Sequence, residues 1–443
     1  MVARRVLVGL FVVSCVLPVT GCSEEARVAG GTPDPAFGGG DGLVFTTIDA
    51  TLNDVFYAVT TDSSNRLIVV GATREATANA DIVAVRYQPD GSLDTTWGSA
   101  GIAIIDIAGF GDAGLAVAID SSGRTLITGY AGNGSDDDWV MLRLTASGVL
   151  DTTFNTTGYR VHDTGGSDVG RAVVVMPNGD IAFAGATRPT TDKDFTVLML
   201  DDAGAFQTTF DGDGMASFDV LGANANDNAC AMVRVGTDLI VAGTTISGGF
   251  GDFAMLRIDS TGAPVTSFGS NGVVSFSFPD GLSDEGLAVA VTGSYVYMTG
   301  RVGKSGGRDV AGVTRHALSD GALDNLWGSG GYALIDFGGD DFNQQGEGII
   351  VQSDGKVVIA GTVTFDDGIV SPHDDIVVGR LTAAGALDTA FSDDGKLTVA
   401  PNGLREDRCH GICAHKTDGF VIVGETEGTG PVQADGFLLR YLK

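Results

Sequence analysis

The sequence predicts an all-β protein, a seven-bladed β-propeller of four-stranded antiparallel blades. Two motifs recur seven times each along the 443 residues, and each repeat contains four short apolar runs. The composition agrees with this prediction, because 67 glycines and a charged fraction of only 19% suit short strands joined by tight turns. A fixed long period is typical of supersecondary units that stack or close into a ring.

The N-terminal segment predicts export and a lipid anchor. Two arginines precede an apolar run over residues 6–19, which closes on the sequence VTGC, ending at Cys22. This order resembles the lipobox of bacterial lipoproteins, and the resemblance implies cleavage after residue 21 and acylation of the Cys22 thiol. Ordinary secretion without a lipid is the alternative. Ser23 stands where an inner-membrane lipoprotein would carry an acid, which favours the outer membrane, at its periplasmic face or at the cell surface.

Three segments are therefore expected. Residues 1–21 form the signal peptide, residues 22–32 hold the lipidated cysteine and a flexible tether, and residues 33–443 form one propeller of seven repeats. We expect a monomer that meets the membrane only through its lipid.

The first repeated motif is GSLDTTWGSAG at residues 91–101, centred on an aromatic residue. We expect it to link the third strand of a blade to the outermost strand, with Asp94 capping the turn and Trp97 filling the seam between blades. A ring of aromatic side chains that stack on sugars is the alternative, but five of the seven are Phe, which has no polar group. The seven aromatic residues are Phe37, Trp97, Phe154, Phe210, Phe268, Trp327 and Phe391.

The second repeated motif is an apolar run that ends in glycine, as in LITG at Gly129. In the second copy the four runs GIAIIDI, GLAVAID, TLITGYA and WVMLRLT are short, rich in β-branched residues and bounded by turn residues, as strands are. Four antiparallel strands repeated radially make a propeller blade. The seven glycines are Gly71, Gly129, Gly185, Gly243, Gly300, Gly361 and Gly424.

The phase of the repeat predicts how the ring closes. The body begins with a first-run strand at residues 43–49 and ends with the fourth-run strand GFLLRYLK, so the two can pair in the last blade. The second run then becomes the innermost strand. It is rich in Gly and Ala, as crowding around a central axis requires.

These motifs together resemble the delta-60 repeat family over essentially all of residues 33–443. The repeats of that family carry an LDxxFGxxG-like phrase, a DGK-like turn before the glycine-ending strand, and an arginine in the next strand. The DGK turn is present literally at residues 354–356. The resemblance implies a β-propeller and little about function. Departures are Gln207 and Val265 in place of the leading Asp of the phrase, and Met199 in place of the arginine.

Two series of acidic residues are candidate sites, and antiparallel strand order predicts that both lie on one face of the ring. Hydrogen bonding of each Asp to loop amides is the first interpretation, and a hard cation such as calcium, bound by the inner series, is the second. The inner series, before each innermost strand, is Asp54, Asp112, Asp168, Asp227, Asp284 and Asp407, with Gln344 in the remaining copy. The outer series, at the start of each third strand, is Asp81, Asp138, Asp194, Asp252, Asp309, Asp375 and Asp435.

Cysteines and histidines give a weaker signal. Cys409, His410, Cys413 and His415 lie close together in RCHGICAH, but side chains alternate along an innermost strand and do not converge on a zinc tetrahedron. Buried free thiols are the favoured interpretation for Cys409, Cys413 and Cys230, and a local disulfide is the alternative. No cofactor is otherwise predicted.

The longest connections belong to the sixth unit and predict a recognition surface there, since binding residues concentrate on long loops. Its candidate residues are Asp340, Asp341, Asp366, Asp367 and His373.

The formal charge of −30 excludes nucleic acid as an expected partner and favours cations or basic surfaces. The sequence thus predicts a non-enzymatic binding or scaffold module of the bacterial envelope, with an envelope protein or a saccharide as partner. An envelope hydrolase or lyase with a metal at the channel mouth is the alternative.

Overall fold

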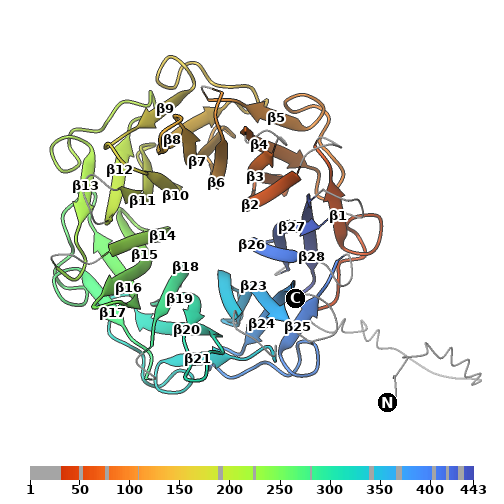
Figure 1. Ribbon diagram of the computed structural model, residues 1–443, viewed down its shortest axis with the longest axis vertical. Helices are drawn as coiled ribbons and strands as arrows, with labels where there is room; N and C mark the ends of the chain where they lie inside the picture. The colour runs from red at the N-terminus through yellow and green to blue at the C-terminus, as the bar shows by residue number, and fades with distance from the viewer. Residues whose placement is uncertain are drawn as a thin grey trace, which may run out of the picture.

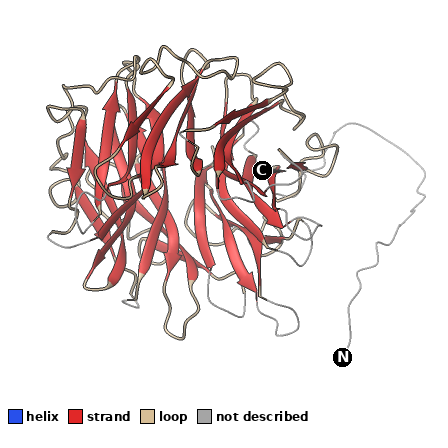
Figure 2. Cartoon of the chain, turned by 45° about the horizontal axis from the view of Figure 1, so that its top comes forward, coloured by secondary structure: helices blue, strands red, loops and turns tan. Residues whose placement is uncertain are grey.

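The computed structural model arranges seven four-stranded antiparallel sheets around one axis, as the sequence predicts (Figure 1). It describes residues 31–48, 53–74, 79–107, 109–187, 193–222, 226–279, 282–338, 344–365, 372–401, 406–415, 419–427 and 434–443. Figure 2 shows strands and loops in these parts of the chain, and none of their residues forms a helix that could span a bilayer.

Each blade runs from an innermost to an outermost strand. Blade 1 has β2 (Asn53–Thr61), β3 (Leu67–Arg74), β4 (Ala80–Tyr87) and β5 (Ile102–Ile105). Blade 2 has β6 (Asp112–Ile119), β7 (Thr125–Gly132), β8 (Asp137–Leu144) and β9 (Tyr159–His162). Blade 3 has β10 (Val169–Val175), β11 (Ile181–Thr187), β12 (Asp194–Leu200) and β13 (Met215–Phe218). Blade 4 has β14 (Asn226–Val235), β15 (Asp238–Ser247), β16 (Phe250–Ile258) and β17 (Val273–Phe276).

The remaining blades follow the same order. Blade 5 has β18 (Asp284–Thr292), β19 (Tyr295–Val302), β20 (Val310–Ala317) and β21 (Tyr332–Ile335). Blade 6 has β22 (Gln344–Val351), β23 (Val357–Phe365), β24 (His373–Leu381) and β25 (Lys396–Val399). Blade 7 has β26 (Asp407–Ala414), β27 (Phe420–Glu427) and β28 (Ala434–Tyr441), and β1 (Leu43–Thr46) is its outermost strand.

The ring closes through the two ends of the described body. β1 pairs antiparallel with β28, so blade 7 contains strands from both ends of the chain (Figure 1). Backbone hydrogen bonds from Asp34 N to Arg440 O (2.9 Å) and from Arg440 N to Gly42 O (2.8 Å) extend this pairing. The expected closure is therefore confirmed, and the edge of β28 is covered.

Every innermost strand carries a β-bulge at the same position, and the repeated glycines explain why it fits. In blade 2, Gly114 pairs with Gly129 and Ala116 with Thr128, which leaves Leu115 as the extra residue. A Cβ on Gly129 would lie 1.9 Å from the carbonyl oxygen of Ala113, so only glycine allows the two strands to approach beside the bulge. The corresponding distances in the other six blades are 1.8 to 2.1 Å.

The hydrophobic core lies in the seams between neighbouring blades. One cluster, for example, joins Trp139 and Phe154 of blade 2 to Phe183 and Leu198 of blade 3. All seven aromatic residues of the first motif are fully buried. The structural interpretation of these aromatic residues is therefore the correct one, and they form no sugar-stacking ring.

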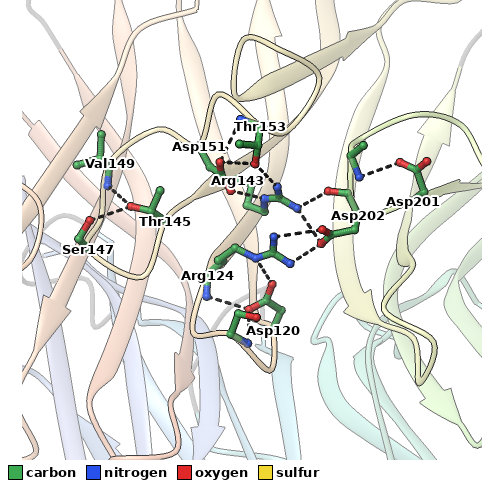
Figure 3. Close-up of polar contacts among 12 residues, drawn as sticks. Asp120, Arg124, Arg143, Thr145, Ser147, Val149, Asp151, Thr153, Asp201 and Asp202 are labelled. Carbon is green, nitrogen blue, oxygen red and sulfur yellow. Dashed lines mark hydrogen bonds and ion pairs between the residues drawn. The ribbon is translucent and has the colours of Figure 1, made fainter.

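In most copies an arginine beside the aromatic residue pairs with a carboxylate and donates a hydrogen bond to a backbone carbonyl of the next blade. Figure 3 shows the blade 2 copy, in which Arg143 Nε donates to Asp151 Oδ2 (2.8 Å) and Arg143 Nη1 donates to the carbonyl oxygen of Asp202 in blade 3 (2.5 Å). The Arg143 guanidinium also lies over the Phe154 ring, 5.1 Å from its centre. We call this arrangement of arginine, carboxylate and aromatic ring the interblade cluster.

Six blades hold an arginine at this position. Arg315 does not fit the spacing of the repeat, because the segment from Arg315 to its partner Asp324 is one residue longer than the segment from Arg86 to Asp94. The six arginines are Arg86, Arg143, Arg257, Arg315, Arg380 and Arg440. Blade 3 has Met199 instead.

Candidate functional site

The central channel contains a cavity of about 580 Å³ that residues of all seven innermost strands line. This volume falls in the range of small-molecule sites, which are commonly about 300 to 1,000 Å³. Its walls combine apolar side chains with a few charged and hydrogen-bonding groups. The cavity is therefore our candidate functional site.

The seven bulged residues all lie in the wall of this cavity. Each follows the inner-series position by three residues, so every blade presents one side chain at an equivalent place. We call them the channel ring: Tyr57, Leu115, Arg171, Cys230, Leu287, Glu347 and His410. Unlike the motif residues, the members of the ring differ in chemistry from blade to blade, because the bulge fixes their direction and not their identity.

Three adjacent members of the ring form a polar cluster across blades 6, 7 and 1. His410 Nδ1 lies 3.8 Å from Glu347 Oε2, and the His410 ring lies 5.1 Å from the Tyr57 ring, centre to centre. Glu347 Oε1 accepts hydrogen bonds from Gln345 Nε2 (2.6 Å) and Thr362 Oγ1 (3.1 Å). Burial raises the pKa of Glu347, and these hydrogen bonds and His410 oppose the rise.

The ring members of blades 3 and 4 complete the polar wall. Arg171 is exposed to the channel, and Cys230 beside it in the next blade is a free thiol whose pKa is raised, mainly by burial. The cluster and Arg171 together offer a cation, an acid, an imidazole and a phenol to one ligand. Such a set can orient a polar ligand through several hydrogen bonds.

A second cavity of about 480 Å³ continues from the first between blades 5 and 7. The two cavities share Gln345, Glu347 and Arg408 in their walls. Arg408 Nε donates to Asp374 Oδ2 (2.6 Å), which anchors this guanidinium at the boundary. The candidate site therefore widens from the channel toward the start of β24, on the face where the innermost strands begin.

The inner aspartate series lies in the seams between blades instead of the cavity wall. Asp112 is fully buried, and its Oδ2 accepts a hydrogen bond from the backbone N–H of Ile107 (2.6 Å), just beyond the outermost strand of blade 1. Gln344 makes the same contact in blade 6, where its Oε1 accepts from Phe337 N (2.6 Å). Equivalent bonds are made by Asp54, Asp168, Asp227 and Asp284. Asp407 is equally buried.

The two acidic series lie at one end of the sheets, as predicted. Asp112 and Asp138, for instance, flank the same residue of β7, Ala131. Among the described residues, one group of acidic side chains is close enough to share a metal ion: Asp81, Asp106 and Asp112, whose oxygens lie within 4.8 Å of one another. Calcium binding by the inner series stays a prediction, and the amide hydrogen bonds support the first interpretation of these residues.

The thiols and histidine of RCHGICAH point in different directions. Cys409 belongs to the core between blades 6 and 7, His410 faces the channel, and Cys413 packs beside the core between blades 7 and 1. Both thiols are free, and burial raises the pKa of Cys413 to about 12. The alternation expected of a strand is thus observed, and Cys409, His410 and Cys413 do not face a common point.

The predicted sixth-unit surface is described only in part. His373 is buried with its ring 5.9 Å from that of Phe365, so it packs in the blade. Asp340, Asp341, Asp366 and Asp367 lie outside the described residues, as does the predicted lipidation site Cys22.

Sequence reasoning missed the channel ring as a set. The signal was present, since each member follows the inner-series position by three residues and precedes a small residue or an apolar one. The residues at these positions differ from copy to copy, so comparison of the repeats for identical residues does not single them out.

Comparisons with known proteins agree with the architecture. The family model described as "Domain of unknown function (DUF5122) beta-propeller" matches residues 63–96, 121–154 and 352–391. None of the curated proteins matches the chain in sequence.

A comparison with solved structures finds several similar chains at low sequence identity. Polysaccharide lyase Uly1 is 12% identical with a TM-score of 0.49, and the match covers 95% of this chain and 94% of that one. Drosophila Semaphorin 2a is 9% identical with a TM-score of 0.48, covering 90% and 76%. Sqt1 from Chaetomium thermophilum is 14% identical with a TM-score of 0.41, covering 88% and 95%. Likeness at this level says nothing about shared function.

Seven blades close into one ring, and the matched family model describes a β-propeller. This chain is a β-propeller repeat protein.

Proposed function

We propose that the protein is a non-enzymatic binding module of the bacterial envelope whose channel holds a saccharide. It is a propeller of the delta-60 type, exported and anchored to the outer membrane through acylated Cys22. A flexible tether of about ten residues would keep the ring within roughly 20 Å of the lipid. The observation that carries the proposal is the channel ring, in which seven differing side chains reach one cavity from seven otherwise similar blades.

A saccharide fits this wall better than an apolar ligand. Arg171, Glu347 and His410 supply donors and acceptors from different blades, as the many hydroxyl groups of a sugar require. The Tyr57 and His410 rings and the two leucines add planar and apolar surface for the sugar ring. An envelope protein bound by the sixth-unit loops remains the second candidate partner, and deletion of residues 366–371 that left its binding unchanged would count against that surface.

The polar cluster also favours a second candidate function, a hydrolase or lyase acting on a saccharide or a peptide. Glu347, His410 and Tyr57 are residue types that transfer protons, and they meet in one cavity. The predicted metal at the channel mouth has less support, because the inner aspartates bind backbone amides in the seams.

The test uses residues 23–443, produced without the lipid. Isothermal titration calorimetry measures their binding to oligomers of N-acetylglucosamine and of uronic acids. We expect one class to bind, and Glu347→Gln or His410→Gln to weaken that binding at least about tenfold, as loss of a buried polar contact does. Arg234→Gln is the matched control, because Arg234 is an exposed residue of the innermost strand β14 that lies outside the cavity wall.

Three results would count against the proposal. No binding across the panel would refute the saccharide, and equal binding by all three variants would refute the channel as its site. New reducing ends or unsaturated products after incubation would replace the binding module with the enzyme.

A further inference from the structure

Blade 3 lacks the arginine of the interblade cluster and has a pocket in its place. Met199 keeps the backbone bonds of that position, since its N–H donates to Gly214 O (2.9 Å) and its carbonyl accepts from Gln207 N (2.8 Å). Arg143 makes the equivalent bonds to Gly158 O (3.0 Å) and from Asp151 N (2.9 Å). The backbone is thus unchanged and the guanidinium alone is missing.

The space left by the missing guanidinium is a cavity of about 390 Å³ between blades 3 and 4. It opens on the face opposite the aspartate series, because the first-motif turns lie at the other ends of the strands. Its wall includes Met176, Asp180, Met199, Gln207, Thr209 and Ser260.

The carboxylate that binds the guanidinium in blade 4 has an equivalent in blade 3. Asp180 precedes Ile181, which pairs with Leu200, just as Asp238 of blade 4 precedes Leu239, which pairs with Ile258. In blade 4, Asp238 Oδ2 accepts from Arg257 Nε (3.0 Å) and Nη2 (2.7 Å). Asp180 therefore occupies the place of an arginine-binding carboxylate.

In blade 3 this carboxylate is bound by neutral amides. Asp180 Oδ2 accepts from Asn178 Nδ2 (2.6 Å), and Gln207 Nε2 lies 3.4 Å from both carboxylate oxygens. A guanidinium would add a charge-assisted, forked contact that these amides cannot supply.

A backbone carbonyl completes the set of acceptors. In blade 2, Arg143 Nη1 donates to the carbonyl oxygen of Asp202, the residue after Asp201 at the start of the facing turn of the next blade. The corresponding residue facing Met199 is Ser260, which follows Asp259 and lines the pocket. The thioethers of Met199 and Met176 form the apolar wall along which the methylene groups of an arginine would pack.

We propose that this pocket binds the side chain of an arginine on a basic partner protein. The partner's guanidinium would pair with Asp180, donate to the Ser260 carbonyl and so occupy the place that an intrinsic arginine fills in the six other blades. The formal charge of −30 favours approach of a basic surface. This site lies away from the channel and is independent of the saccharide proposed there.

The experiment follows amide resonances of residues 23–443 by NMR during titration with N-acetyl-L-arginine amide, which carries the side chain and no free termini. We expect shifts at the pocket residues with a dissociation constant of about 1 to 10 mM, as suits one isolated side chain. The citrulline counterpart, which is neutral and of similar shape, should cause no saturable shift.

Two variants and one control locate the binding. Met199→Arg restores the intrinsic guanidinium and should abolish the shifts, and Asp180→Asn should weaken binding roughly tenfold. Asp213→Asn removes an equal charge from an exposed residue outside the pocket wall and should leave binding unchanged.

Failure of Met199→Arg to fold would leave the decision to Asp180→Asn. Binding that survives in both Met199→Arg and Asp180→Asn, or that equals the binding of citrulline, would overturn the proposal. Free L-arginine binding at least about tenfold more tightly than the blocked form would assign the pocket to the free amino acid and overturn the protein partner.

Discussion

Replacing Asp112 by Asn should stabilise the protein at neutral and alkaline pH. Burial, together with nearby Asp106 and Asp81, raises the pKa of Asp112 from 3.8 to about 7, although backbone donors oppose the rise. The folded protein therefore holds an extra proton between about pH 4 and pH 7 and loses stability as the pH rises through this interval. Asn keeps the acceptor for Ile107 N–H and never ionises.

The size of the effect follows from the pKa difference. About three pH units correspond to roughly 4 kcal/mol above pH 7, which is an upper bound because the seam can relax around the charge. For a ring of about 400 residues this corresponds to a difference of roughly 5 °C in Tm. Differential scanning calorimetry of wild type and Asp112→Asn in chelator should show this difference in Tm at pH 8.5 and no difference at pH 4.

The reciprocal variant is Gln344→Glu, which places an acid where blade 6 has a neutral amide with the same hydrogen bond. It should lower Tm at pH 8.5 and recover at pH 4. A lower Tm for Asp112→Asn in chelator at pH 8.5 would refute the reasoning. A rise of several degrees with calcium in wild type that Asp112→Asn abolishes would show instead that Asp112 is a cation ligand.

Three further predictions concern residues that the fold itself requires. Arg143→Ala leaves the Asp151 carboxylate without its buried partner and should cost about 3 to 5 kcal/mol, seen as a lower Tm; an unchanged Tm would show that the interblade cluster contributes nothing. Gly129→Ala forces a Cβ to 1.9 Å from the Ala113 carbonyl oxygen and should cost more than about 3 kcal/mol, so a Tm within about 1 °C of wild type would contradict the bulge. Cys409, which is fully buried and whose pKa that burial raises well above its usual value, should react with a thiol reagent at pH 8 only after urea unfolds the protein; rapid labelling of Cys409 in the native form would contradict its burial.

The positions that repeat could be predicted from the sequence because geometry demands the same residue in every blade. The fully buried Trp97 and the glycine at Gly129 are such positions, and the closing pair of β1 and β28 followed from the phase of the repeat. Local chemistry and chain order were enough for all three. The bulges beside the glycines were not foreseen, because an extra residue in one strand leaves no composition signal of its own.

The candidate site could be predicted only in part. Asp112 and Gln344 were recognised as one series, yet their buried place in the seams depends on how adjacent blades pack. Glu347 and His410 lie 63 positions apart in the chain and meet only because the ring brings blades 6 and 7 together. Contacts of that kind come from tertiary packing, which the sequence pattern of one blade does not contain.

We propose that the channel ring is free to serve binding because the fold does not need its side chains. The most direct test measures Tm for the combined variant Arg171→Ala, Glu347→Gln and His410→Gln of residues 23–443 beside Arg143→Ala. We predict a Tm within about 2 °C of wild type for the channel variant, since removal of the buried Glu347 charge offsets the lost hydrogen bonds. A decrease as large as that of Arg143→Ala would show that the channel ring is structural and would contradict the claim.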